Sequence, residues 1–392
     1  MQAPETRHNL RLLVAAQALG AASPPIIISL GGIVGQGLAP DVALATLPVS
    51  LYNLGLALST IPVALLMRRV GRRAAYVLGA VMAMLGAVVA TMGIATSGFV
   101  LFCVGTALAG FYGACVQSYR FAASDIVAPH ERPKAISRIM LGGLIAAIIG
   151  PQVVIWTRDA WPALPFAGSF LGQAGLALLA LPVLLMLRLP AASQAEAGGV
   201  ARPLGQIARN PQFLVAVLSG IVSYGLMAFI MTAAPMAMVA CGHTVGEAAL
   251  GIQWHVLAMF GPSFFTGHLI TRFGKIGITA LGLVLIAASG LLALAGLELL
   301  HFWGSLVLLG VGWNFGFVGA TAMVTDTYTA PERAKVQALN DFLVFGTVAC
   351  ASFGAGRLLS SAGWDRINAL MLPLIAVTLL LLAGLAWRGR KA

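Results

Sequence analysis

The chain has 392 residues, of which 59% are hydrophobic and only 9% are charged. Soluble domains carry about 25% charged residues, so this composition excludes a protein whose surface lies mostly in water. The formal net charge of +11 would suit a nucleic-acid partner, but nearly all of the basic residues fall on one side of the predicted membrane.

Apolar runs of roughly 18 or more residues, long enough to cross a bilayer, recur along the chain. The predicted membrane helices cover 12–34, 42–66, 74–96, 98–120, 136–156, 166–187, 212–240, 248–270, 277–297, 300–324, 337–360 and 367–387. The segment between the sixth and seventh helices is rich in Ala, Gly, Ser and Pro. We therefore expect an all-α membrane protein of twelve helices. Its N-terminal six-helix bundle (1–188) and C-terminal six-helix bundle (211–392) are joined by a cytoplasmic linker (189–210).

The lysine and arginine residues indicate how the helices are oriented. If the N-terminus is cytoplasmic, 20 of the 23 basic residues fall on the cytoplasmic side, and only Arg158, Arg357 and Arg366 fall on the other. Because cytoplasmic loops carry an excess of Lys and Arg, both termini are expected in the cytoplasm. The positive charge is then a topology signal, and the expected partner is a lipid bilayer, with no nucleic acid.

The two halves of the sequence repeat each other. Residues 69–73 (Arg-Val-Gly-Arg-Arg) follow the second predicted helix, and residues 272–275 (Arg-Phe-Gly-Lys) follow the eighth, 203 positions later. The fourth and tenth helices contain related Gly-Phe-x-Gly-Ala segments at 110–114 and 316–320. Six-helix repeats of this kind are typical of transporters that expose a central site to each side of the membrane in turn.

The two basic loops resemble the Gly-x-x-x-Asp-Arg-x-Gly-Arg-Arg motif of the major facilitator superfamily. The second loop keeps Gly267 but has Thr271 in place of the acid, and the first has Ala64 and Arg68 in place of the glycine and the acid. The resemblance covers nearly the whole chain and implies the major facilitator fold. It also implies a conformational gate made by Arg69, Gly71, Arg72, Arg73, Arg272, Gly274 and Lys275.

Two pairs of potential metal ligands lie in the seventh and eighth predicted helices. Met227 and Met231 are four residues apart, as are His255 and Met259, so each pair shares one helix face. Met227 and Met259 are expected near the middle of the membrane, with the other two about 6 Å nearer the periplasm. Thioether and imidazole groups suit Cu(I), whereas hard cations bind thioethers poorly. If the two faces meet, the four residues form a copper site.

These four residues closely resemble the ligands of the CcoA-type copper importers, which carry Met-x-x-x-Met in helix seven and His-x-x-x-Met in helix eight. The resemblance implies copper import across the bacterial inner membrane by alternating access, to supply assembly of cbb3-type cytochrome c oxidase. We expect copper to be the transported substrate, the carrier to be a monomer, and no cofactor to be needed. Further accessory candidates are Cys241, His243 and Asp341.

Other functions remain open. An importer of an organic solute such as riboflavin would need aromatic and hydrogen-bonding side chains in both halves. The candidates are Tyr52, Asn53, Gln117, Tyr224, Gln253, Trp254, Trp313 and Asn314. Gly150 and Pro151 resemble an element of proton-driven drug exporters. A copper-binding assembly factor that does not transport is a further alternative, disfavoured by the paired basic loops. An enzyme is not expected, because the sequence has no nucleophile–base pair, phosphate loop or metalloprotease signature.

Overall fold

The computed structural model describes residues 4–128, 131–189 and 202–389, and every regular element within these ranges is helical. The elements of the N-terminal half, residues 4–189, are α1 (Pro4–Gly20), α2 (Ser23–Leu38), the 3-10 helix η1 (Val42–Leu44), α3 (Leu47–Ala95), α4 (Phe99–Asp125), α5 (Arg132–Thr157) and α6 (Ala167–Leu185). Those of the C-terminal half, residues 202–389, are α7 (Leu204–Ala208), α8 (Pro211–Ala240), α9 (Val245–Phe260), α10 (Ser263–Phe273), α11 (Lys275–Ala295), α12 (Leu299–Val324), the 3-10 helices η3 (Thr325–Thr327) and η4 (Ala330–Glu332), and α13 (Arg333–Gly389).

The described helices make twelve passes through a membrane. Nine helical segments in the described part of the chain are long and apolar enough to span a bilayer. Two of them have 54 residues each, and each turns back at a single glycine, Gly71 in α3 and Gly363 in α13, to make two passes. The shorter helices α9 and α10 follow one another and together make the remaining pass. The predicted all-α fold is confirmed.

Proline explains two passes that are broken where the sequence predicts one helix. The first pass is divided into α1 and α2 at Ala21 and Ala22, and α2 then begins with proline in its first turn. The eighth pass is interrupted at Gly261 and Pro262, between α9 and α10. Proline has no backbone N–H to donate and its ring clashes with the preceding turn, so a helix restarts more easily than it continues.

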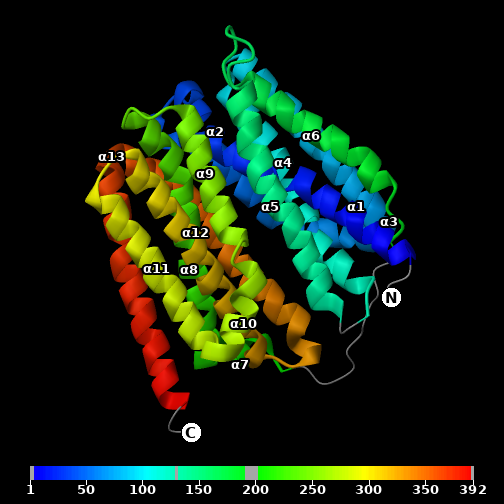
Figure 1. Cartoon of the computed structure of the whole chain (residues 1–392), viewed down its shortest axis with the longest axis vertical. Helices are drawn as coiled ribbons and strands as arrows, with labels where there is room; N and C mark the ends of the chain where they lie inside the picture. Colours follow the sequence, from blue (N-terminus) through cyan, green and yellow to red (C-terminus); the bar gives the residue numbers. More distant parts are fainter. Residues whose placement is uncertain (1–3, 129–130, 190–201, 390–392) are drawn as a thin grey trace.

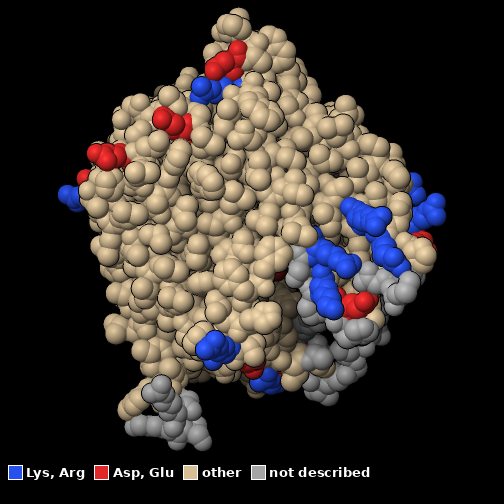
Figure 2. Space-filling model, in the orientation of Figure 1, with Lys and Arg blue, Asp and Glu red and all other residues tan. Residues whose placement is uncertain are grey.

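The two ends of the molecule differ in charge. We call the end with the turns at Gly71 and Gly274 the basic face, and the end with η1 and the turn at Gly363 the opposite face. Both termini lie in the lower half of Figure 1, at the basic face, with α4, α5 and α6 on one side and α11, α12 and α13 on the other. On the side shown in Figure 2, uncharged residues cover most of the surface, and most Lys and Arg lie toward the basic face.

Small residues bring the helices of each half close together. In the C-terminal half a Cβ on Gly282 of α11 would lie 2.6 Å from the Cα of Gly316 on α12, so only glycine permits this approach. In the N-terminal half a Cβ on Gly105 of α4 would lie 2.8 Å from the Cα of Ala90 on α3. Packing through small residues is typical of membrane helices, which gain little from hydrophobic exclusion in lipid. Most of the predicted linker (189–210) lies outside the described residues, and the bundle boundaries stay a prediction.

Candidate functional site

A cavity of about 320 Å³ lies between the two halves of the chain. This volume falls within the range of about 300–1,000 Å³ that is usual for small-molecule sites. Its lining comes from α1, α2, α3, α4 and α5 of the N-terminal half and from α8, α9, α10, α12 and α13 of the C-terminal half. Most of the lining is apolar, and its polar side chains are Gln17, Tyr52, Asn53, Gln117, Arg120, Tyr224, Thr232, Ser263, Asn314, Thr321, Asn340 and Asp341.

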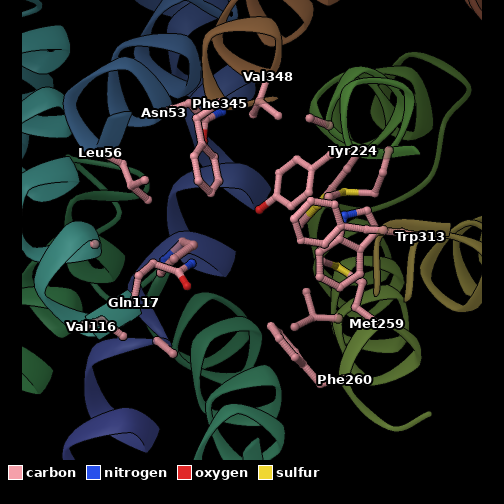
Figure 3. A pocket seen from close by; sticks show the side chains of 18 of the residues that line it. Asn53, Leu56, Val116, Gln117, Tyr224, Met259, Phe260, Trp313, Phe345 and Val348 are labelled. Carbon is pink, nitrogen blue, oxygen red and sulfur yellow. The ribbon is translucent and has the colours of Figure 1, made fainter. Parts of the chain in front are cut away.

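An aromatic wall forms the C-terminal side of this cavity. Tyr224 of α8 packs edge-on against Trp313 and Phe317 of α12, with ring centroids 5.3 and 5.0 Å apart. Trp313 and Phe317 are themselves nearly parallel, at 16° and 5.5 Å. Phe345 of α13 packs edge-on against Tyr224 at 5.7 Å. Figure 3 shows the Tyr224 hydroxyl pointing into the open space, away from Trp313. The wall therefore offers both flat apolar surface and a hydrogen-bonding group.

Amide and hydroxyl groups occupy the N-terminal side. Gln117 of α4 lies across the cavity from Trp313 (Figure 3), and Asn53 of α3 lies nearer to α13. Tyr52 packs over Gly113, where a Cβ would lie 2.8 Å from the Tyr52 hydroxyl oxygen. Uncharged donors and acceptors therefore face an aromatic surface across an apolar space.

Hydrogen bonds between the halves close the cavity toward the opposite face. The Asn53 amide of α3 donates to the Ser352 hydroxyl of α13 at 2.9 Å. Within the C-terminal half, the Thr232 hydroxyl donates to the same oxygen at 3.3 Å. The Gln152 amide donates to the Gln253 carbonyl oxygen at 3.0 Å, which joins α5 to α9. In the other direction the lining continues about one helical turn past Gln117 and Phe345, to Arg120 of α4 and Asp341 of α13.

The structure separates the four residues predicted to bind copper. The side chains of Met227, Met231 and Met259 line the cavity. His255 is fully buried and does not belong to the lining; its Nδ1 donates to the Leu306 carbonyl of α12 at 2.7 Å. Three thioethers thus reach the same cavity, while the imidazole is held by α12.

The predicted gate residues occupy two equivalent turns. Gly71 has φ 84° and ψ 159°, and Gly274 has φ 80° and ψ 156°, so the two repeats adopt nearly the same backbone conformation. Positive φ of this kind is readily adopted only by glycine. Arg69 and Arg73 are exposed beside the first turn, and the Arg272 guanidinium lies over the Phe273 ring at 5.2 Å.

An ion pair accompanies each of these turns. Arg72 contacts Asp125 at 2.5 Å, and Lys275 contacts Asp326 at 2.5 Å, so each turn is tied to the end of the fourth helix of its own half. The two pairs occupy equivalent places in the repeats. That these residues form a moving gate stays a prediction.

The accessory candidates lie in two different places. Asp341 lines the cavity, but Cys241 and His243 are at the opposite face, where the His243 Nε2 lies 2.9 Å from the Leu297 carbonyl. Burial and the nearby Asp365 carboxylate raise the pKa of the Cys241 thiol, which disfavours the thiolate that binds metals. In the described part of the chain, no three His, Cys, Asp or Glu side chains gather in a group that could hold a metal ion.

Comparison with known proteins identifies the family. The sequence pattern of the Major Facilitator Superfamily matches residues 12–343. The chain belongs to the Major Facilitator Superfamily. Among solved structures, the human organic anion transporter MFSD10 (TETRAN) has the same fold as this chain, with a TM-score of 0.69. The match covers 97% of this chain and 100% of that one, at 14% sequence identity.

Two bacterial relatives cover almost the whole chain. The Riboflavin transporter RfnT of Brucella anthropi is 60% identical over 379 residues, which are 96% of this chain and 95% of that protein. The Uncharacterized MFS-type transporter YddS of Bacillus subtilis is 28% identical over 404 residues, 98% of this chain and 92% of that protein. The superfamily and the transporter character of the chain are confirmed.

The prediction of copper import is wrong. A relative that is 60% identical across nearly the full length is a riboflavin transporter, which contradicts the resemblance to CcoA-type importers and favours the organic-solute alternative. Methionine is also a flexible apolar side chain with a polarisable sulfur that makes favourable contacts with aromatic rings. Three cavity methionines are therefore as compatible with a flat organic ring as with a soft metal.

Six of the eight residues proposed for an organic solute do line the cavity: Tyr52, Asn53, Gln117, Tyr224, Trp313 and Asn314. Gln253 is engaged by Gln152, and Trp254 is 46% exposed on the outer surface. The sequence prediction missed Phe317, Phe345 and Arg120. A signal for Arg120 was present, because it follows Gln117 by three residues and so shares its helix face.

Proposed function

We propose that this protein imports riboflavin across the bacterial inner membrane by alternating access. The observation that carries the proposal is the 60% identity to a riboflavin transporter over 96% of the chain. At this identity over nearly the full length the two chains share most of their residues, which supports a common substrate. The fold supports a transport mechanism, because two six-helix repeats surround one central cavity.

The chemistry of the cavity supports a flavin. Riboflavin has a flat tricyclic ring, whose edge carries hydrogen-bonding groups, and an uncharged polyhydroxy chain. The flat ring matches the wall of Tyr224, Trp313 and Phe317, where each aromatic contact contributes about 0.5–1.5 kcal/mol beyond buried area. The amides of Asn53 and Gln117 can donate to and accept from the polar edge and the chain.

The charge distribution supports an inward-facing state. Basic residues favour the cytoplasmic side, so the basic face and both termini are assigned to the cytoplasm. The contacts of Ser352 and Gln253 with the N-terminal half then close the periplasmic side. In alternating access these contacts break to admit riboflavin from the periplasm. The ion pairs of Arg72 and Lys275 accompany the turns on the cytoplasmic side.

The test is uptake of labelled riboflavin by a bacterial strain that neither makes nor otherwise imports riboflavin. The wild-type chain is expected to restore growth at low external riboflavin and to accumulate the label. Trp313→Ala is expected to abolish accumulation, because it removes the largest ring of the aromatic wall. Trp254→Ala is the matched control, since the same truncation falls on an exposed surface outside the cavity.

Two measurements make the outcome decisive. The amount of each variant in the membrane is measured. Trp313→Leu, which keeps a larger apolar side chain but has no aromatic ring, replaces Trp313→Ala if the alanine variant is not found in the membrane. Failure of the wild-type chain to take up riboflavin refutes the proposal. Equal uptake by the Trp313 and Trp254 variants refutes the placement of the ring at this wall.

A further inference from the structure

Two opposite charges face the cavity from different halves of the chain. Arg120 of α4 and Asp341 of α13 both belong to the lining, on the side nearer the basic face. Each is close enough to affect the other electrostatically, and the charge of Arg120 also acts on the Tyr224 hydroxyl. The Asn340 amide donates to the Asp341 carboxylate at 3.1 Å, which holds the carboxylate at this place.

These two residues balance the charge of the cavity. Among the lining residues that the structure describes, Arg120 and Asp341 alone carry a charge, so the described lining has a net charge of zero. An arginine in a cavity would otherwise be a strong site for phosphate, because its planar guanidinium offers several donors to the oxygens. Asp341 offsets this positive charge and repels an approaching anion.

Arg120 and Asp341 lie where the polyhydroxy chain of a bound flavin would reach. Asp341 lies four residues before Phe345 on α13, and Arg120 lies three residues after Gln117 on α4, so both are about one helical turn beyond the aromatic wall. A flavin whose ring packs on Tyr224 and Trp313 can direct its polyhydroxy chain toward this pair. Phosphorylated flavins carry their phosphate at the end of that chain.

We propose that Asp341 is a specificity-determining residue: by neutralising Arg120 it makes the cavity select uncharged riboflavin and reject flavins that carry a phosphate. The inference rests on the proposed riboflavin function. A phosphate monoester carries a charge of about −1.5 to −2 at pH 7. Its transfer from water into a mostly apolar cavity is costly unless a net positive charge compensates it. With Asp341 present, the lining supplies no such charge.

The test compares equilibrium binding of riboflavin and riboflavin 5′-phosphate to the purified full-length protein, followed by quenching of flavin fluorescence. Wild type is expected to bind riboflavin more tightly than the phosphate ester. Asp341→Asn leaves Arg120 uncompensated and is expected to shift the ratio of the two Kd values toward the ester, on the order of tenfold. Asp365→Asn is the matched control, because Asp365 is exposed outside the cavity and its variant should keep the wild-type ratio.

A double variant tests whether Arg120 is the source of the increased relative affinity for the phosphate ester. Arg120→Gln with Asp341→Asn leaves the lining neutral again and is expected to restore preference for riboflavin. Asp341→Ala removes the same charge and replaces Asp341→Asn if that variant is not recovered from the membrane. Three results would overturn the inference. Wild type could bind both flavins equally, the Kd ratio could stay unchanged on loss of the Asp341 charge, or the double variant could gain as much relative affinity for the phosphate ester as Asp341→Asn. Absence of saturable riboflavin binding by wild type instead refutes the proposed function.

Discussion

Closure of the opposite face depends on a close contact between α13 and the segment before α3. A Cβ on Gly356 would lie 2.8 Å from the Cγ2 and 3.0 Å from the Cβ of Thr46, which is fully buried. Thr46 is branched at Cβ and sits at the start of a helix, so it cannot move away without moving the backbone. Gly356→Val is therefore expected to hold the two halves apart on this side.

The size of the effect follows from the cost of overpacking. Extra methyl groups in a well-packed site cost about 1–3 kcal/mol. This cost applies only to the state in which Gly356 and Thr46 are in contact, so it shifts the balance toward the state open on the opposite face by a factor of about 5 to 150. A shift in the ratio of the state open on the opposite face to the state closed there, from 1:99 to 50:50, needs about 2.7 kcal/mol. This value lies within the range of about 1–3 kcal/mol.

The assay measures access to the cavity from outside the cell. A single cysteine replaces Ala228, which lines the cavity, in a chain without its native cysteines, and whole cells are treated with a membrane-impermeant maleimide. Gly356→Val is expected to label faster than the parent and to take up riboflavin more slowly. Gly354→Val is the control, because a Cβ there meets nothing within 4 Å. Equal labelling and uptake in the two valine variants would refute the claim that this contact closes the transporter.

Three further predictions concern other parts of the chain. Met231→Leu should keep most riboflavin uptake, because the exchange conserves apolar volume and usually costs less than about 1.5 kcal/mol; a complete loss in a variant present in the membrane would contradict an apolar role for this side chain. Arg72→Ala with Lys275→Ala breaks both ion pairs at the turns and should slow uptake while the Kd for riboflavin, measured by fluorescence, stays unchanged. The Arg202 guanidinium holds the pKa of Glu332 well below its usual value, so the ion pair between them stabilises the folded state. This contribution to folding stability is complete above the unfolded pKa of about 4.3 and is lost as the pH falls through the folded pKa. Glu332→Gln should therefore lower the Tm of the detergent-solubilised protein at pH 7, and the difference from wild type should narrow on acidification.

Much of the fold could be predicted from the sequence because its causes are local. Apolar length fixes the membrane passes, and the repeated loops predict two related halves, whose turns at Gly71 and Gly274 have almost the same φ and ψ. The tight hairpins were not predicted. The sequence suggests loops of several residues on both sides of Gly71 and before the last helix, but one glycine with positive φ suffices in α3 and in α13. Loop length depends on how the neighbouring passes pack, and hydropathy carries no information on this.

The same limit explains the position of His255. The i,i+4 spacing predicts that His255 and Met259 lie near one helix face, but α9 both lines the cavity and packs against α12. Met259 reaches the cavity, whereas His255, one turn earlier, contacts α12. Gly310 is the cause, since a Cβ there would be 2.5 Å from the His255 carbonyl oxygen; its absence lets α12 approach until the Leu306 carbonyl accepts from the imidazole. A spacing on one helix does not reveal a glycine on another.

The substrate could not be decided by the most conspicuous motif, for a reason that lies in the chemistry of methionine. A thioether can bind a soft cation, or it can pack against an aromatic ring, and its sequence spacing is the same in both cases. The surrounding wall decides between the two roles. Tyr52 and Phe345 are almost 300 positions apart in the sequence and reach the same cavity as Tyr224 and Trp313, and no periodicity within one helix predicts that convergence. Aromatic residues supplied by four separate helices to one cavity are therefore a stronger indication of a flat organic substrate than two short motifs are of a metal.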